Sequence, residues 1–532
     1  MRFWLQPFSR PTAGHGSLPN IGEAWSLLHH AAPMRSIETL NILGIFPFEG
    51  KSHFFVFKSL LEELAKRGHN MTVISHFPRE KLLKNYHDIS LAGTAKIVED
   101  DFPVLRNYIT IISDTIFVTS TGVANCELML ENEKVQHLWK THTKYDVAIV
   151  EQFNSDCSLG LAYKLKTPVV GVNSHVLLPW HYNRFGIPHN PSYVSAQFLG
   201  GGTNPTLYQR VERTIFNVYA QLLYKYYAQR SNEKTLAQHF GDGIPPLEDL
   251  GREIKFLLHY NYFVLTGSRL LPANVIEVAG YHIAKPKVLP DEIRNFIEES
   301  EHGVIFISFG STVKTSTLSI KKQEVITNTL SKLPQRVIWK WNEKSLPANS
   351  ENIFASEWLP QNDILAHPNV VAFFSHCGNL GTLEAVTYGV PILGMPIHGD
   401  QASNAAAIEE SGFGIQMDLE DLTEEKLLKN LKVILDPQFR ERVKMLSKSF
   451  LDRPMSAMDT AIYWIEFAAR YPNSTFRAKS ADVPLYQYLC LDVMAVFACI
   501  SLLIVLIIKV LIRLCSPKES RNISYRKKSK RE

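Results

Sequence analysis

The chain has 532 residues, of which 45% are hydrophobic and 11% aromatic, as in a packed globular protein. The net charge of +4 is unevenly spread: residues 509–532 hold nine Lys or Arg and two acidic residues, a charge of +7, so the remainder carries about −3 (4 minus 7). The body therefore offers no basic face for nucleic acid, and the length allows two or more domains.

Residues 1–36 contain no periodic pattern, and we treat them as an atypical amino-terminal extension. A secretory signal requires an uninterrupted apolar stretch. The best candidate, residues 21–32, is interrupted by Glu23 and by the His29-His30 pair. The sequence predicts no signal peptide of ordinary form at this end.

Residues 40–75 have the pattern of one βαβ unit, with an apolar strand at each end and a helix between them. The helix is indicated by apolar residues at helical spacing, which are Phe54, Phe57, Leu60, Leu61 and Leu64. Its end is marked by the Arg67-Gly68 pair. Further strand patterns follow at residues 147–151, 169–173 and 262–266. Because strands alternate with helices, we predict a parallel sheet flanked by helices.

A second series of strand patterns begins after Pro290, at residues 303–309, 337–341, 370–375 and 390–394. We therefore predict an α/β fold with two Rossmann-like domains that face a cleft, at residues 37–280 and 281–484. The boundary is expected between Pro272 and Pro290, because prolines there interrupt any long helix or strand.

Residues 485–514 are predicted to form a transmembrane helix. The largely apolar stretch of about 24 residues is long enough to cross a bilayer, and residues 493–508 contain no charge. A buried core helix is the alternative, but a basic tail follows directly. The positive-inside rule places that tail, residues 515–532, in the cytosol. Lys528 and Lys530 resemble a dilysine retrieval signal, with a lipid-binding basic tail as the alternative.

Six cysteines in a chain of this length are not a disulfide framework, and we expect buried free thiols. A Cys126–Cys157 disulfide is the less favoured alternative and requires an oxidising compartment. Two glycosylation sequons precede the apolar segment. We expect Asn70, beside a core strand, to be too buried for modification, and Asn473, in a loop, to be the better acceptor.

The most informative segment is residues 373–401, which reads as strand, glycine-bearing loop, helix, strand and polar loop. Parallel sheets bind ligands at loops that follow the carboxyl ends of their strands. Glycines in the first loop allow a ligand to approach the backbone, and the helix after it has free N–H groups suited to a phosphate. The second loop ends in Asp400 and Gln401, which are suited to sugar hydroxyls.

This segment resembles the signature of the UDP-glycosyltransferases, in their membrane-anchored animal branch. Residues 358–368 resemble the segment that leads to the uracil-binding site in the same family, and residues 271–278 give a weaker match. The resemblance covers roughly residues 40–515. It implies a GT-B arrangement of the two domains in a single-pass protein of the endoplasmic reticulum membrane, with the catalytic domains lumenal. Since the family usually begins with a cleaved signal, residues 1–36 depart from its pattern.

The resemblance makes His53, at the start of the first helix, the catalytic base. A helix N-terminus disfavours imidazolium and so keeps the ring neutral, as a base acting near neutral pH requires. A carboxylate is expected to fix its tautomer. Glu151 stands at a strand end where better-known members carry Asp, and we prefer it to Asp156.

The resemblance assigns the UDP-sugar to the second domain. Trp358 would stack on uracil, although a core position is the alternative for this residue, and Gln361 would bond the nucleoside. Glu384 would accept the ribose hydroxyls, and Asp400 and Gln401 would bind the sugar. The pyrophosphate would be held by Ser311, His376 and the backbone at Gly378, Gly381 and Thr382.

Cys377 stands where the family often has Gly, which should be tolerated if its side chain points into the core. We expect no metal site and no cofactor beyond the UDP-sugar co-substrate, because the sequence lacks a clustered Cys/His arrangement and an Asp-x-Asp motif at a strand end. The helix dipole and His376 would instead stabilise the leaving diphosphate.

The implied reaction is a direct displacement with inversion, in which His53 takes the proton of an acceptor hydroxyl. Residues 176–226 are rich in aromatic residues and leucine and suit a small lipophilic alcohol or phenol, with core packing or a membrane-facing surface as alternatives. UDP-glucose is the expected donor, because the sequence looks closer to invertebrate members. A glucuronosyltransferase, a catalytically inactive lipophile-binding protein and a homo-oligomer remain open alternatives.

Overall fold

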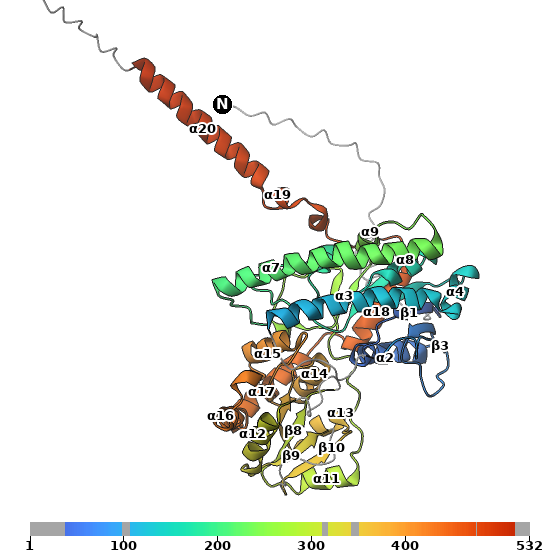
Figure 1. The fold of residues 1–532 in the computed structure, drawn as a ribbon, viewed down its shortest axis with the longest axis vertical. Helices are drawn as coiled ribbons and strands as arrows, with labels where there is room; N and C mark the ends of the chain where they lie inside the picture. The colour runs from blue at the N-terminus through green and yellow to red at the C-terminus, as the bar shows by residue number, and fades with distance from the viewer. Residues whose placement is uncertain (1–37, 98–106, 311–317, 342–350, 475, 516–532) are drawn as a thin grey trace, which may run out of the picture.

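The computed structural model describes residues 38–97, 107–310, 318–341, 351–474 and 476–515 (Figure 1). Two all-parallel sheets organise it. The first sheet has seven strands in the order β3-β2-β1-β4-β5-β6-β7. These are β1 (Asn41–Phe46), β2 (Asn70–Ser75), β3 (Tyr86–Ser90), β4 (Val147–Glu151), β5 (Val169–Asn173), β6 (Leu257–His259) and β7 (Val275–Glu277).

The second sheet has six strands in the order β10-β9-β8-β11-β12-β13. They are β8 (Val304–Ser308), β9 (Arg336–Lys340), β10 (Ile353–Ser356), β11 (Val370–Ser375), β12 (Ile392–Gly394) and β13 (Gly414–Gln416). The chain order changes direction between β1 and β4 in the first sheet and between β8 and β11 in the second. Loops that leave such switch points diverge and open a crevice, which is where sheets of this kind bind ligands.

Helices cover both sheets. Those between the strands of the first sheet are α2 (Lys51–Lys66), α3 (Tyr108–Glu131), α4 (Glu133–Lys140), α5 (Cys157–Lys164), α6 (Tyr182–Phe185), α7 (Leu207–Leu223), its π-helical continuation η1 (Tyr224–Gln229), α8 (Arg230–Phe240), α9 (Leu247–Arg252) and α10 (Phe263–Thr266). Those of the second are α11 (Asp291–Glu298), α12 (Ile320–Ser331), α13 (Gln361–Leu365), α14 (Asn379–Tyr388), α15 (Gln401–Glu410), the 3-10 turn η3 (Leu419–Asp421), α16 (Glu424–Ile434) and α17 (Pro437–Leu451).

The last part of the chain returns to the first sheet. Helix α18 (Ala457–Arg470) packs against α2, β4 and β5. Arg67 donates to Asp459 at 2.6 Å, and the ring of His69 bonds Glu466 at 3.3 Å. The turn η4 (Lys479–Asp482), the short helix α19 (Leu485–Tyr488) and the long helix α20 (Leu491–Cys515) follow.

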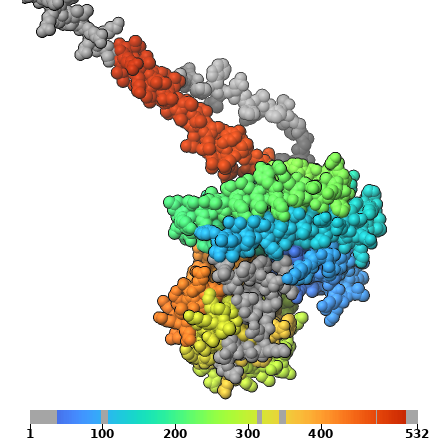
Figure 2. Space-filling view, viewed as in Figure 1, coloured from blue at the N-terminus to red at the C-terminus, as the bar shows by residue number. Residues whose placement is uncertain are grey.

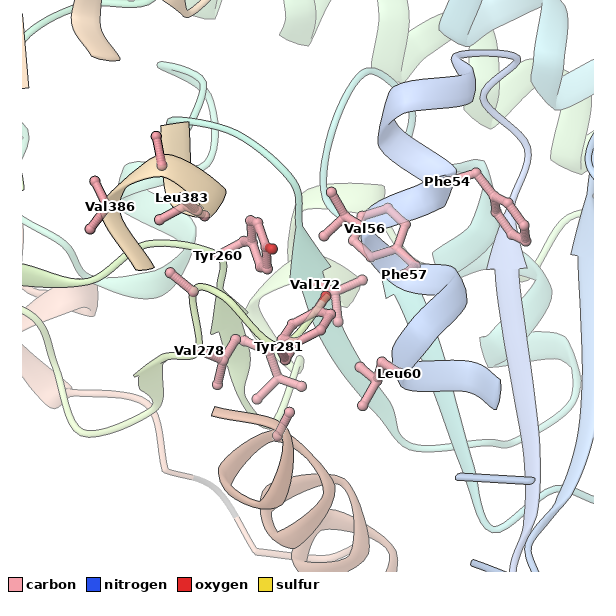
Figure 3. Close-up of a cluster of buried hydrophobic side chains, with 14 of the residues drawn as sticks. Phe54, Val56, Phe57, Leu60, Val172, Tyr260, Val278, Tyr281, Leu383 and Val386 are labelled. Atoms are coloured by element: carbon pink, nitrogen blue, oxygen red, sulfur yellow. The ribbon is translucent and has the colours of Figure 1, made fainter. Parts of the chain in front are cut away.

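One apolar core runs through both sheets. Its buried residues include Phe57 and Leu60 of α2, and Leu383 and Val386 of α14. Figure 3 shows α2 and α14 on opposite sides of the segment that carries Tyr260 and Tyr281. Burying one such side chain is worth about 1.5–3 kcal/mol, so this contact stabilises the position of each sheet against the other.

The predicted strands at residues 147–151, 169–173 and 370–375 are confirmed. The strand predicted at residues 262–266 is wrong, because Phe263–Thr266 is a helical turn, and the strand lies upstream at Leu257–His259. The Tyr262 carbonyl accepts hydrogen bonds from the Leu265 and Thr266 N–H groups, which closes the turn. An apolar run this short has no periodicity that separates strand from helix.

The expectation of free thiols is wrong for two of the six cysteines. Cys126 of α3 and Cys157 of α5 form a disulfide, with Cα atoms 5.4 Å apart. Cys377 is a buried thiol as expected, whereas Cys490, Cys499 and Cys515, in or beside α20, are exposed rather than buried. The disulfide joins α3 to α5, which are 31 residues apart at the two cysteines, and spacing along the sequence does not reveal that these helices meet.

The expectation that Asn70 is buried is also wrong. Asn70 is the first residue of β2 and is exposed, and its side chain donates to Asn41 Oδ1 at 3.1 Å. The strand enters the core only from Met71 onward. Asn473 is exposed, as expected of a loop residue.

Two helices among the described residues are long and apolar enough to cross a membrane, namely α3 and α20. Helix α20 begins at Leu491 rather than at residue 485, because Cys490 has a positive φ of 53° and separates it from α19. Every residue of α20 is exposed, and the helix projects from the body, whereas α3 is partly buried against it (Figure 1).

We predict that the Cys126–Cys157 disulfide stabilises the fold. Replacing both residues with Ala should lower the free energy of unfolding by about 2–4 kcal/mol, because the unfolded chain loses a covalent constraint. The midpoint of denaturant unfolding of the full chain in detergent measures this, with Cys499→Ser as the matched control. Alkylation of Cys126 and Cys157 in the native, unreduced protein would contradict the assignment.

Candidate active site

A cavity of about 380 Å³ lies between the two sheets, at the crevices formed by both switch points. Its wall combines the loop after β1 with the loops after β8 and β11. The predicted site residues that line it are His53, Trp358, Gln361, His376, Gly378, Gly381, Asp400 and Gln401. Residues from the two predicted domains thus meet around one space.

His53 lies in the first turn of α2, directly after β1. Its Nδ1 is 2.8 Å from Oε1 of Glu151, the last residue of β4. The imidazole also packs against the rings of Phe48 and Phe153, with centroids 4.8 and 4.5 Å away. Because Nδ1 is engaged with a carboxylate, Nε2 is the nitrogen left for a ligand in the cavity.

Asp156, the other predicted partner of His53, has a different role. Both its oxygens accept from the Arg184 guanidinium, each at 2.7 Å, and Gln229 donates to it at 2.9 Å. Arg184 and Asp156 are almost completely buried. Removing one member of such a pair costs about 3–5 kcal/mol, so Asp156 is a structural residue of the first domain. The structure therefore brings Glu151, and not Asp156, to His53.

The helix N-terminus predicted for the pyrophosphate is that of α14, which begins at Asn379. The ring of His376 fills the space beside Gly310 and Gly378, where an added Cβ would lie 2.5 and 2.4 Å from its Nε2. A side chain at either position would therefore displace the His376 ring. Burial lowers the pKa of His376 to about 3, with the charge of His398 adding to the effect, so the ring is neutral and can offer a ligand a hydrogen bond but no charge.

Cys377 adopts a positive φ of 64°, a conformation that glycine adopts without cost and that costs other residues roughly 1 kcal/mol. This explains why glycine suits the position. The thiol is fully buried and packs at Gly394, as required for a side chain at this point to be tolerated.

Trp358 is 72% exposed, so the alternative of a core tryptophan is wrong. Gln361 lines the cavity behind it and donates to Glu384 at 2.6 Å. Thr382 is fully buried within α14 and does not line the cavity, and its N–H donates to the Gly378 carbonyl at 3.0 Å, so the structure does not bring it to the predicted phosphate site. Ser311 lies outside the described residues.

Asp400 and Gln401 lie at the start of α15. Gln401 is buried, and its Oε1 accepts from the N–H groups of Ile397 and His398, so only its amide NH₂ is left for a ligand. Burial raises the pKa of Asp400, while a hydrogen bond from Asn404 opposes that shift. The loop between β12 and α15 is thereby held in place by its own polar residues.

Sequence reasoning missed three polar residues of the cavity wall. Lys340, the last residue of β9, lines the cavity, and its Nζ donates to the Gly310 carbonyl at 2.8 Å. Ser174 and His175 directly follow β5, and both are buried. All three stand at carboxyl ends of strands, which is the signal that could have identified them.

Ser174 and His175 present unpaired polar atoms. His175 Nδ1 bonds the Val176 carbonyl, which places the proton on Nδ1 and leaves Nε2 as a hydrogen-bond acceptor. Among the residues that the structure describes, neither His175 Nε2 nor Ser174 Oγ has a hydrogen-bond partner. Burial lowers the pKa of His175 to about 3, so the ring stays neutral. This wall of the cavity can therefore accept a hydrogen bond from a hydroxyl group.

Hydrogen bonds join the two domains at residues that line the cavity or lie next to it. Asn379 of α14 donates to the Ser174 carbonyl at 3.0 Å. The N–H of Phe198 donates to the Gly399 carbonyl at 3.1 Å. No group of three or more His, Cys, Asp or Glu able to hold a metal ion is found among the described residues.

The sequence profile of the family described as "UDP-glucoronosyl and UDP-glucosyl transferase" matches residues 42–522. The chain belongs to this family. It is 37% identical to the UDP-glycosyltransferase UGT5 of Dactylopius coccus over 477 residues, which is 88% of this chain and 90% of the relative. It is 35% identical to UDP-glucosyltransferase 2 of the same insect, with 85% and 88% covered. The rabbit (Oryctolagus cuniculus) UDP-glucuronosyltransferase 2B13 is more distant, at 27% identity, with 87% and 91% covered.

Solved structures agree in fold. A UDP-glucosyltransferase from Polygonum tinctorium, described as capable of glucosylating indoxyl, superposes with a TM-score of 0.55 at 14% identity, over 81% of this chain and 99% of that one. The calicheamicin glycosyltransferase CalG4 gives a TM-score of 0.54 at 17% identity, with 82% and 98% covered. The predicted GT-B arrangement is confirmed, and the protein is a UDP-glycosyltransferase.

Glu384 generates a prediction on pH. Burial raises its pKa to about 7, although the hydrogen bond from Gln361 opposes the shift. The carboxyl group is therefore protonated below that pH and ionised above it. The family resemblance implies that ribose hydroxyls donate to the ionised form. We therefore expect UDP-glucose to bind more tightly as the pH rises through 7, and up to about tenfold more weakly for each unit below it.

Calorimetric titration of the full-length protein with UDP-glucose at about pH 6 and pH 8 measures this dependence, since the ligand's diphosphate does not titrate in that range. Glu384→Gln keeps an acceptor oxygen and should remove the dependence. Equal affinities of the unmodified protein at both pH values would contradict the assigned role.

Proposed function

We propose that this UDP-glycosyltransferase transfers a hexose from a UDP-sugar to a hydroxyl group of a small lipophilic acceptor. The transfer inverts the anomeric configuration and uses no metal ion or other cofactor. One observation carries the proposal: His53, bonded to Glu151 at 2.8 Å, lines the same cavity as Asp400 and Gln401 of the other domain. A catalytically inactive binding protein would have no need of this pair.

In the proposed step, Nε2 of His53 takes the proton of the acceptor hydroxyl as its oxygen attacks the anomeric carbon. The bond from that carbon to the diphosphate oxygen breaks, and its electrons leave with UDP. Glu151 holds the tautomer and stabilises the imidazolium that forms. The charge on the departing diphosphate would be stabilised by the N-terminus of α14, by Lys340 and by hydrogen bonding to His376.

The acceptor would lie on the side of the first domain. Phe48, Phe117, Phe153 and Phe198 line the cavity there. Within residues 176–226, Trp180 and Tyr224 are buried and stack on each other, with centroids 4.5 Å apart, so part of that aromatic segment is core. The remaining phenyl rings would accommodate an aromatic or aliphatic alcohol that leaves water readily.

UDP-glucose is the proposed donor sugar nucleotide, because the insect relative with 35% identity is named a UDP-glucosyltransferase, whereas the mammalian glucuronosyltransferases are more distant. Glucuronate is the alternative sugar. Lys340 supports this alternative, because a cation in the cavity could pair with the carboxylate of glucuronate.

We further propose that the protein is a single-pass protein of the endoplasmic reticulum membrane. Helix α20 would span the bilayer, with both domains in the lumen and the basic tail in the cytosol. The Cys126–Cys157 disulfide supports an oxidising compartment.

The donor is tested with microsomes that contain the full chain, a panel of phenols, and UDP-glucose or UDP-glucuronate supplied separately. We expect transfer from UDP-glucose and little from UDP-glucuronate. Preferential transfer from UDP-glucuronate would overturn the proposed donor, and absence of transfer from both in correctly inserted protein would overturn the proposed activity on such acceptors.

The base is tested with His53→Ala, which should lower kcat by about 10²–10⁴-fold while UDP binding is retained. The exposed His87 of the same domain provides the matched control, since His87→Ala should leave kcat unchanged. Glu151→Gln should lower kcat with little effect on the donor KM. Turnover by His53→Ala at the unmodified rate would show that another group takes the proton.

A further inference from the structure

Residues 108–124 of α3 present an exposed face without charge, whereas the exposed residues further along the helix include Glu127 and Glu131. Between Tyr108 and Ala124 its exposed residues are Tyr108, Ile109, Ile112, Ser113, Ile116, Phe117 and Ala124. Ile109 is 79% exposed, and Ile112 and Ile116 are each 46% exposed. The opposite face, which includes Ile111, Thr115 and Val118, is buried. A helix with one buried face cannot cross a bilayer, but it can lie along the surface of one.

Helix α7 presents a second apolar face with helical spacing. Leu207, Val211, Ile215, Val218 and Leu222 recur every three or four residues, and each is at least half exposed. Its buried face carries Arg213, Phe216, Asn217 and Ala220. The outward face is therefore more apolar than the inward one, which is the reverse of an ordinary surface helix.

The two faces belong to one surface, which we call the α3–α7 surface. The hydroxyls of Tyr108 and Tyr208 are hydrogen bonded at 2.5 Å. Figure 2 shows α3 and α7 side by side as the outer layer of the body, on the side from which α20 projects. Soluble proteins rarely expose a continuous apolar surface of this extent, so it indicates a partner.

The connection to α20 identifies the partner. Arg477 donates to the carbonyl of Arg184 at 2.9 Å and forms an ion pair with Asp482, which fixes the start of the linker to the first domain. Only residues 483–490 then separate η4 from α20. A bilayer that holds α20 therefore lies within a few residues of the domain that carries the α3–α7 surface.

The charges around the surface fit a membrane. Arg210 and Lys225 are the exposed charged residues of α7 and the start of η1, and both can reach lipid headgroups while their stems stay apolar. Helix α16 in the other domain provides the contrast: four of its five exposed residues are charged, namely Glu425, Lys426, Lys429 and Lys432, and the fifth is Val433. Helix α16 thus offers no apolar face comparable to that of α7.

We propose that the α3–α7 surface lies in the interfacial layer of the bilayer that α20 spans, and that lipophilic acceptors enter the cavity from the lipid. Phe117 supports the entry route, because it is 40% exposed on this surface and also lines the cavity. Asp114 and Val118 of the same helix line the cavity as well. The entry route rests on the proposed acceptor class, whereas the membrane contact does not.

The membrane contact is tested by placing a photoactivatable phenylalanine analogue at Ile112, Ile215 or Val433 of the full chain in nanodiscs of phosphatidylcholine and phosphatidylserine. Irradiation should attach phospholipid at positions 112 and 215 and not at the control position 433. Equal labelling at all three positions, no lipid at 112 and 215, or a cross-link to a second copy of the chain would overturn the proposal. This readout needs no enzymatic activity.

The entry route is tested with Ile112→Glu and Ile215→Glu, with Val433→Glu as the control. The first two variants should raise the KM for a membrane-partitioning phenol several-fold and leave kcat/KM for a water-soluble sulfonated phenol unchanged. An unchanged KM for the lipophilic phenol would overturn lipid entry. Equal loss on both phenols would show damage to the fold and would likewise overturn it.

Discussion

The position of the site depends on the packing of two parallel sheets whose switch points face each other. Each switch point opens a crevice of its own, and the cavity exists because an apolar core holds the two crevices together. Tyr260 and Tyr281 lie in that core, and the cavity that it holds together is lined by His53 from one domain and Asp400 from the other. Residues far apart in the chain therefore act on one space although each domain forms only half of it.

Burial is the second determinant of the chemistry. It keeps His376 and His175 neutral, so the charge available to a diphosphate comes from Lys340 and the α14 N-terminus rather than from imidazolium. It also brings the titration of Glu384 to about pH 7. The half of the cavity wall that lacks cations, around Phe48 and Phe153, is the half suited to a lipophilic acceptor.

The fold and much of the site were predictable because they depend on local patterns. Strand ends placed His53 and Glu151 at one edge of the first sheet and Asp400 at an edge of the second, and the family resemblance supplied their expected roles. The disulfide and the ion pair of Asp156 were not predictable, because each joins segments whose proximity depends on helix packing. Lys340 and His175 also stand at strand ends, but that position marks them only as candidates, because a lone lysine or histidine there can equally be a surface or core residue.

The outward face of α7 shows a further limit of sequence reasoning. The aromatic segment at residues 176–226 was compatible with an acceptor wall, a core or a membrane-facing surface. The structure divides it among these roles: Trp180 and Tyr224 are core, Phe198 lines the cavity, and Ile215 is exposed. Composition could not make this division, because it depends on which side of each helix packs inward.

We infer that His53 and Glu151 act as one unit in proton transfer, and a double-mutant cycle on kcat can measure this. Kinetics of His53→Ala, Glu151→Gln and the double variant, each in the full chain with saturating donor and acceptor, would give the coupling between them. We expect the double variant to be no slower than His53→Ala alone, because a carboxylate that acts only through the imidazole has no effect once the ring is gone. Fully additive losses would contradict it and would show that Glu151 acts independently of His53.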